Sequence, residues 1–199
     1  MPGPAVLRPY DPTWPGRAAR LLTAVERAVE PLGVAQSFEH IGSTSVPGLT
    51  AKAYVDLQVL VGELPPPELL DPALAAAGFV PTTGARPDSP GVHRDVPRGS
   101  EQVPDEVWRE RLFVHDVDGP GAAILHVRLA ASPWGRHTLW FRDWLRAHPD
   151  ARDRYASFKA RVAADHAGDA DHDDHTRAKT GFFDEVQEQF EAWGRRRAR

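Results

Sequence analysis

The sequence predicts an α+β protein in which a mixed β-sheet is followed by a helical C-terminal third. Residues 53–61 alternate apolar and polar side chains with the period of a β-strand. Residues 108–115 and 122–129 have the composition of two further strands, and the Asp-Gly-Pro-Gly sequence between them predicts a hairpin turn. From residue 134 onward, apolar and aromatic residues recur at the spacing of helices.

Length and composition limit the class of protein. The chain has 199 residues, 41% of them hydrophobic and 26% charged, so we expect one domain over residues 1–199. Residues 1–132 would form its sheet core and residues 133–199 a helical layer. The absence of cysteine excludes disulfides, thiolate metal sites and a cysteine nucleophile. A net charge of −4 argues against nucleic acid as a partner. We find no signal peptide and no apolar run that could span a membrane, which predicts a cytoplasmic protein.

The elements before the hairpin are predicted from the positions of proline, glycine and apolar residues. A helix is expected over residues 15–29, because a proline suits its first turn and apolar residues follow at helical spacing. A short strand is expected over 36–41, a short helix near 69–77 and a strand at 79–80. Residues 81–107 are rich in proline, glycine and charge, which predicts a long irregular loop of the kind that is often functional or mobile.

The C-terminal third carries three aromatic stripes, which we expect to belong to the core rather than to a binding site. They comprise Trp140, Phe141, Trp144 and Leu145; Tyr155, Phe158 and Val162; and Phe182, Phe183, Val186, Phe190 and Trp193. Between the second and third stripe, residues 166–175 are rich in Asp and His. We interpret this segment as an acidic linker with a helix N-terminus, the alternative being a metal site.

The loop Gly42-Ser43-Thr44-Ser45 is the most distinctive local composition of the chain. Gly42 allows a ligand to approach the backbone, and the hydroxyl and amide donors after it can cradle a phosphate. Asp56 follows on the polar face of the next strand, where a carboxylate can hold Mg²⁺. The alternative is a capping loop with a solvated Asp56. The loop is neither a Walker P-loop nor a Rossmann turn, because neither glycine pattern is present.

Three further side chains are candidates for the same site. His126 could be a general base or a ligand in the cleft, with a structural role as the alternative. His40 could bond a phosphate or only orient the loop. Lys52, one of three lysines in the chain, could pair with a phosphate or lie at the surface.

Residues 39–49, with the sequence EHIGSTSVPGL, together with Lys52 and Asp56, resemble the signature of the GrpB family, also called UPF0157. The resemblance continues along the chain at residues 9–15, 125–127 and 141–146, and at Tyr155 with Lys159. It implies a fold of the polymerase-β-like nucleotidyltransferase superfamily.

Enzymes of that superfamily bind two Mg²⁺ through carboxylates and transfer a nucleotidyl group from a nucleoside triphosphate. Here the resemblance implies nucleotide or phosphate binding by Gly42–Ser45 with His40 and Lys52, and transfer to an unknown small-molecule acceptor. Asp56 and Gln58 take the positions of the metal-binding pair, and His126 stands on the polar face of a later strand. Because Gln58 is neutral, it cannot bridge two divalent ions as an anion would. The alternative function is a non-catalytic nucleotide- or phosphate-binding regulatory module of the same fold.

Overall fold

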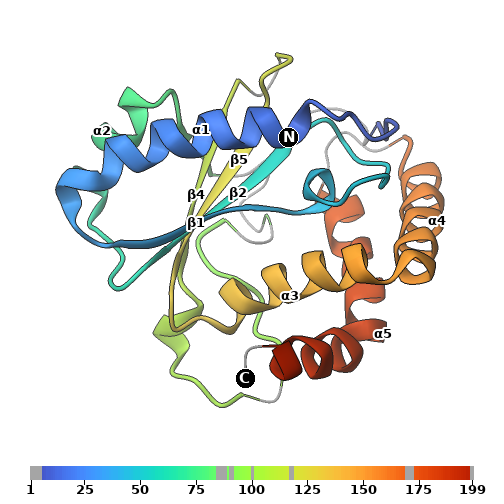
Figure 1. Cartoon of the computed structure of the whole chain (residues 1–199). Helices are drawn as coiled ribbons and strands as arrows, with labels where there is room; N and C mark the ends of the chain where they lie inside the picture. Colours follow the sequence, from blue (N-terminus) through green and yellow to red (C-terminus); the bar gives the residue numbers. More distant parts are fainter. Residues whose placement is uncertain are drawn as a thin grey trace.

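The computed structural model places a five-stranded sheet between two groups of helices (Figure 1). Helices α1 (Trp14–Val29) and α2 (Pro67–Ala76) cover one face, and the C-terminal helices lie on the other side. The structure describes residues 6–83, 89, 92–99, 101–116, 119–168 and 173–197. None of the helices in this described part is long and apolar enough to cross a membrane.

The sheet is mixed, which confirms the predicted fold class. Its order is β1-β2-β5-β4-β3, with β2 and β5 parallel and the other neighbours antiparallel. The strands are β1 (Ala35–Ile41), β2 (Val55–Val61), β3 (Val80–Pro81), β4 (Glu110–His115) and β5 (Ala123–Leu129).

The interior strand β2 shows which residues face the core and which face the site. Val55, Leu57, Val59 and Val61 are all buried in the cluster shared with α1 and α2. Each such side chain contributes about 1.5–3 kcal/mol on leaving water. Because successive side chains of a strand point to opposite faces, Asp56 and Gln58 face the C-terminal helices instead.

Three helices build the opposite layer and enclose a second apolar cluster. They are α3 (Pro133–Ala147), α4 (Pro149–Asp165) and α5 (Asp173–Arg197). Proline stands in the first turn of both α3 and α4, where its missing N–H costs no helical hydrogen bond. The aromatic stripes pack into this cluster, in which Phe182, Val186 and Phe190 are buried. The expectation that they belong to the core alone is only partly met, because four of their residues also line a cavity: Phe141, Leu145, Tyr155 and Phe183.

The segment before the hairpin differs from expectation at one end. Residues 105–108, the last of which we expected in a strand, form a short 3-10 helix, and β4 begins at Glu110. The register explains this, because the pairing of β4 with β5 starts at Glu110 opposite Arg128. Two more 3-10 helices lie at Glu30–Leu32 and Ser43–Ser45. Much of the predicted acidic linker, residues 169–172, lies outside the described residues.

Candidate functional site

A cavity of about 250 Å³ lies between the polar face of the sheet and the C-terminal helices. The Gly-Ser loop, β2 and β5 supply its polar wall, and α3, α4 and α5 supply most of its apolar wall. Its described lining residues are Ile41, Gly42, Ser43, Val46, Asp56, Arg98, His126, Arg128, Trp134, Thr138, Phe141, Arg142, Leu145, Tyr155, Thr180 and Phe183.

Gly42 is required at the start of the loop for two reasons. Its backbone has φ +70° and ψ −172°, a conformation that is essentially restricted to glycine. A Cβ at this position would stand 2.1 Å from Oδ2 of Asp56. The Asp56 carboxylate therefore lies directly against the loop backbone, and the structure brings Gly42, Ser43 and Asp56 together at one cavity wall.

Ser43 is held by a side chain of helix α4, which lies more than a hundred residues later in the chain. Lys159 is only 2% exposed, and its ammonium donates to Ser43 Oγ over 3.1 Å and to the carbonyl oxygen of Thr50. The same ammonium lies 4.8 Å from the ring centroid of Tyr155. Burial raises the pKa of Tyr155 to about 12, although a side-chain hydrogen bond with Ser43 acts in the opposite direction. A cation and two hydroxyl groups thus meet at the loop.

The other polar residues of the loop have structural partners. His40 Nε2 and Thr44 Oγ1 are 3.0 Å apart, and the Ser45 hydroxyl donates to the Gly42 carbonyl over 2.5 Å. Burial, followed by the charges of Arg146 and Arg142, lowers the pKa of His40 to about 4, so its imidazole is neutral near pH 7. These contacts fix the shape of the loop. His40, Thr44 and Ser45 are not among the described lining residues of the cavity.

Lys52 and Lys159 illustrate how sequence position can mislead. Neither lysine is among the described lining residues, but Lys159 reaches Ser43 of that lining from a helix more than a hundred residues later, whereas Lys52 only precedes β2 in the chain. The sequence did contain a signal for Lys159. It falls on the same helix face as Tyr155 and Val162, and a lysine within an apolar stripe needs a partner.

A buried network lies behind His126 on β5. Arg128 donates to both oxygens of Asp95 over 2.7 and 2.9 Å, and its Nη2 is 3.0 Å from Glu110 Oε2. Nδ1 of His126 lies 2.9 Å from the same Glu110 oxygen. Burial, followed by the charge of Arg128, lowers the pKa of His126 to about 3. His126 is therefore a neutral hydrogen-bonding group at the cavity wall and a weak base.

Gln58 belongs to this network and not to the described cavity lining. Its side-chain oxygen accepts from Arg128 over 3.1 Å and from Thr138 over 3.0 Å, and its amide donates to the Gly135 carbonyl over 3.1 Å. The single hydroxyl proton of Thr138 can go to this oxygen or to the carbonyls of Trp134 and Gly135, whereas the bond from Arg128 is fixed. A metal ion at Gln58 would require the loss of these bonds.

The donor set does not fit a pair of Mg²⁺ ions. Asp56 is the single carboxylate among the described lining residues, and within the described part of the chain no three His, Asp or Glu side chains gather into a metal-binding group. Asp95 and Glu110 are buried against Arg128, and burial raises the pKa of both carboxyls. Neither residue was expected at the site, because neither stands in a recognisable motif.

Comparison with known proteins places the chain among a recognised group. The family model described as GrpB protein matches residues 4–189. A UPF0157 protein of Streptomyces coelicolor is 36% identical over 77% of this chain and 67% of its own length. The solved GrpB structure from Enterococcus faecalis superposes with a TM-score of 0.64 at 19% identity, covering 92% of this chain and 99% of that one, which supports the fold.

A second group of relatives is longer. A protein of Mycolicibacterium paratuberculosis named dephospho-CoA kinase is 31% identical over 90% of this chain, but the match covers 44% of the relative. The chain therefore spans less than half the length of this relative.

Proposed function

The chain belongs to the GrpB family, and from its cavity we propose that it binds a small nucleotide or another phosphorylated molecule. The observation that carries the proposal is the buried Lys159 ammonium, which lies behind the cavity wall and donates to the hydroxyl of Ser43 in that wall. A buried cation with a hydroxyl neighbour favours an anion, because charge-assisted hydrogen bonds are the strong ones in a low-dielectric site.

Side chains would contribute to binding such an anion at the loop. The amides of Ser45 and Val46 donate to the carbonyls of Gly42 and Ser43, so these two amides are occupied within the turn. A phosphate at this wall would therefore use the hydroxyl of Ser43 and the charge of Lys159 rather than these two amides.

The remaining lining suits a flat ring. Trp134, Phe141 and Phe183 line the cavity, and aromatic side chains stack on nucleobases with little dependence on which base is bound. The volume of about 250 Å³ is slightly below the range of roughly 300–1,000 Å³ typical of small-molecule sites. A monophosphate suits this space better than a complete triphosphate.

Nucleotidyl transfer from a nucleoside triphosphate to a small-molecule acceptor is a second candidate function, favoured by the position of Asp56 beside Ser43. Because the residues do not fit two Mg²⁺ ions, we propose at most one ion, held by Asp56 together with phosphate oxygens of the ligand. The kinase name of the mycobacterial relatives is not transferred, since this chain spans less than half of them and contains no Walker loop.

The test is calorimetric titration with the four nucleoside triphosphates and their monophosphates, with and without Mg²⁺. Lys159→Met should weaken binding by about 10- to 100-fold, the equivalent of one lost charge-assisted hydrogen bond. Lys52→Met is the matched control, because it removes the same charge from a half-buried lysine, whereas Lys159 is 2% exposed and donates to Ser43. Asp56→Asn should abolish only the part of binding that depends on Mg²⁺.

Two results would contradict these proposals separately. If the parent protein binds none of the nucleotides, or if Lys159→Met binds them as well as the parent, phosphate binding at this cavity is wrong. If Asp56→Asn retains the full effect of Mg²⁺, the transferase proposal fails and the non-catalytic module is preferred.

A further inference from the structure

Arg98 enters the cavity from the irregular segment before β4, opposite helix α5. Its side chain is 10% exposed and forms an ion pair with Asp184. Its guanidinium lies 5.8 Å from the ring of Trp134 and 5.5 Å from the ring of Phe183. The Nε atom is buried and has no hydrogen-bond partner among the described residues. A buried guanidinium donor without a partner is a costly feature that a bound ligand can relieve.

The backbone around Arg98 is firmly held. Asp95 forms two hydrogen bonds with Arg128, and the Val96 carbonyl accepts from Trp134 Nε1 over 2.7 Å. The amide of Asp95 also donates to the Trp108 carbonyl over 2.9 Å. Arg98 is therefore positioned at the cavity by its neighbours.

The other two guanidinium groups of the described lining are already committed. Arg128 is bound by Asp95, Glu110 and Gln58 inside the protein. Arg142 donates to Glu39 over 2.9 Å and to the His40 carbonyl over 3.0 Å, and it also pairs with its neighbour in the chain. Arg98 differs because its carboxylate partner, Asp184, is 56% exposed and can return to water at little cost.

We propose that Arg98 binds an oxyanion of the ligand, phosphate or carboxylate, and that Asp184 competes with the ligand for this guanidinium. The inference rests on the proposed phosphate binding and extends it. Together with Lys159 it favours a ligand with two negative charges, because Arg98 lines the cavity and the Lys159 ammonium donates to Ser43 in the same lining. The planar fork of arginine suits both kinds of oxyanion, and stacking on the two rings leaves its N–H edge available.

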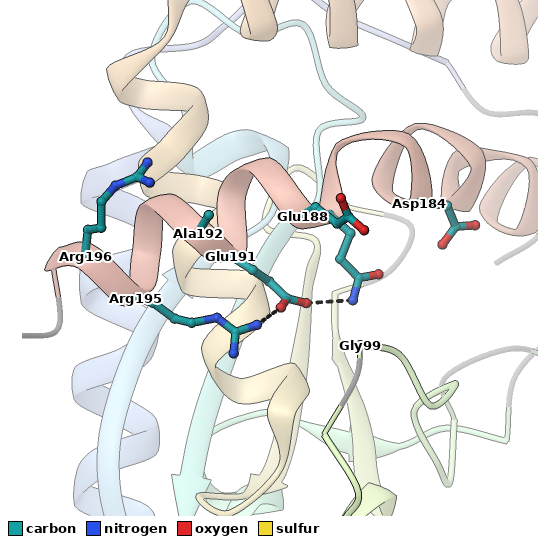
Figure 2. A pocket seen from close by; sticks show the side chains of 8 residues that line it. Gly99, Asp184, Glu188, Glu191, Ala192, Arg195 and Arg196 are labelled. Carbon is teal, nitrogen blue, oxygen red and sulfur yellow. Dashed lines mark hydrogen bonds and ion pairs between the residues drawn. The ribbon is translucent and has the colours of Figure 1, made fainter.

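Asp184 provides a test that does not disturb the core. It stands on α5 beside a groove of about 700 Å³, whose wall it shares with Gly99 and Glu188 (Figure 2). Asp184→Asn removes the competing charge, while Glu188→Gln removes an equal charge one turn along the same helix. The control for Arg98 is Arg94, which lies in the same segment and also pairs with an exposed carboxylate, Asp105, but is not among the described lining residues of the cavity.

The experiment is calorimetric titration of the full chain with inorganic phosphate, pyrophosphate and succinate, which separates phosphate from carboxylate recognition. We expect Asp184→Asn to bind the preferred anion about 3- to 10-fold more tightly than the parent does. Glu188→Gln should change the affinity by less than about 2-fold, because salt screens a charge that does not contact the guanidinium. Arg98→Gln should weaken binding by about 10- to 100-fold and Arg98→Lys by less, whereas Arg94→Gln should match the parent.

Failure of phosphate binding and failure of the role given to Arg98 have different signatures. If the parent binds none of the three probes and none of the nucleotides, the proposed function itself fails. If the parent binds but Asp184→Asn shows the same affinity as Glu188→Gln, Arg98 is a structural residue and this inference is wrong. The comparison of Asp184→Asn with Glu188→Gln does not require Arg98→Gln to fold. Asp184 is exposed, so its substitution should leave the fold intact.

Discussion

Replacing Gly42 by alanine should destabilise the protein more than any other single-methyl change in the loop. The backbone at φ +70° and ψ −172° costs a non-glycine residue about 1–3 kcal/mol. The added methyl group would also stand 2.1 Å from Oδ2 and 2.8 Å from Cβ of Asp56, so the carboxylate must move. Such overpacking costs a further 1–3 kcal/mol, roughly. We expect a total loss of about 2–6 kcal/mol in the free energy of unfolding.

The control is Gly33→Ala, at the other end of β1. Gly33 also has a positive φ, +66°, but a Cβ there would meet nothing within 4 Å. Its substitution should cost only the left-handed backbone penalty, about 1 kcal/mol. Urea denaturation measures both values, and equal losses for the two variants would refute the close approach of Asp56 to the loop. Combining Gly42→Ala with Asp56→Gly should recover the steric part of the loss and leave the backbone part.

Three other predictions concern stability. Arg128→Met should cost about 3–5 kcal/mol in urea denaturation because it leaves two buried carboxyls uncompensated, whereas Arg94→Met, at an exposed pair, should cost less than about 1 kcal/mol. The pKa of His40 is lowered to about 4, so the folded state resists protonation and the free energy of unfolding decreases as pH falls from 6.5 towards 4. His40→Gln should lose less stability over that pH range, and equal pH dependence of the unfolding free energy in variant and parent would contradict this. Gly194→Ala on α5 should destabilise the folded protein, because its Cβ would stand 2.3 Å from the Trp140 indole on α3. Gly181→Ala, also on α5, should stabilise the protein by about 0.5–1 kcal/mol, and thermal melts measure both changes.

The local chemistry of the loop and sheet was visible in the sequence. The period of two along residues 55–61 determined that Asp56 would face away from the core, and the loop composition marked Gly42 and Ser43 as its neighbours. The hairpin pattern likewise placed His126 and Arg128 on one strand face. These predictions succeed because they depend only on the geometry of a single strand or turn.

The partners of these residues depended on tertiary structure. Lys159 reaches Ser43, Glu110 and Asp95 surround Arg128, and Arg98 enters the cavity from a segment without helix or strand. Periodicity indicates which face of an element is buried, but not which distant element covers it. Gln58 shows the consequence, because its position beside Asp56 suggested a metal ligand, whereas in the fold its oxygen accepts from Arg128 on β5 and its amide donates to Gly135 on α3. The sequence thus determined which polar side chains lie on the strand face opposite the core, and only the packing of distant segments decided which of them face the cavity.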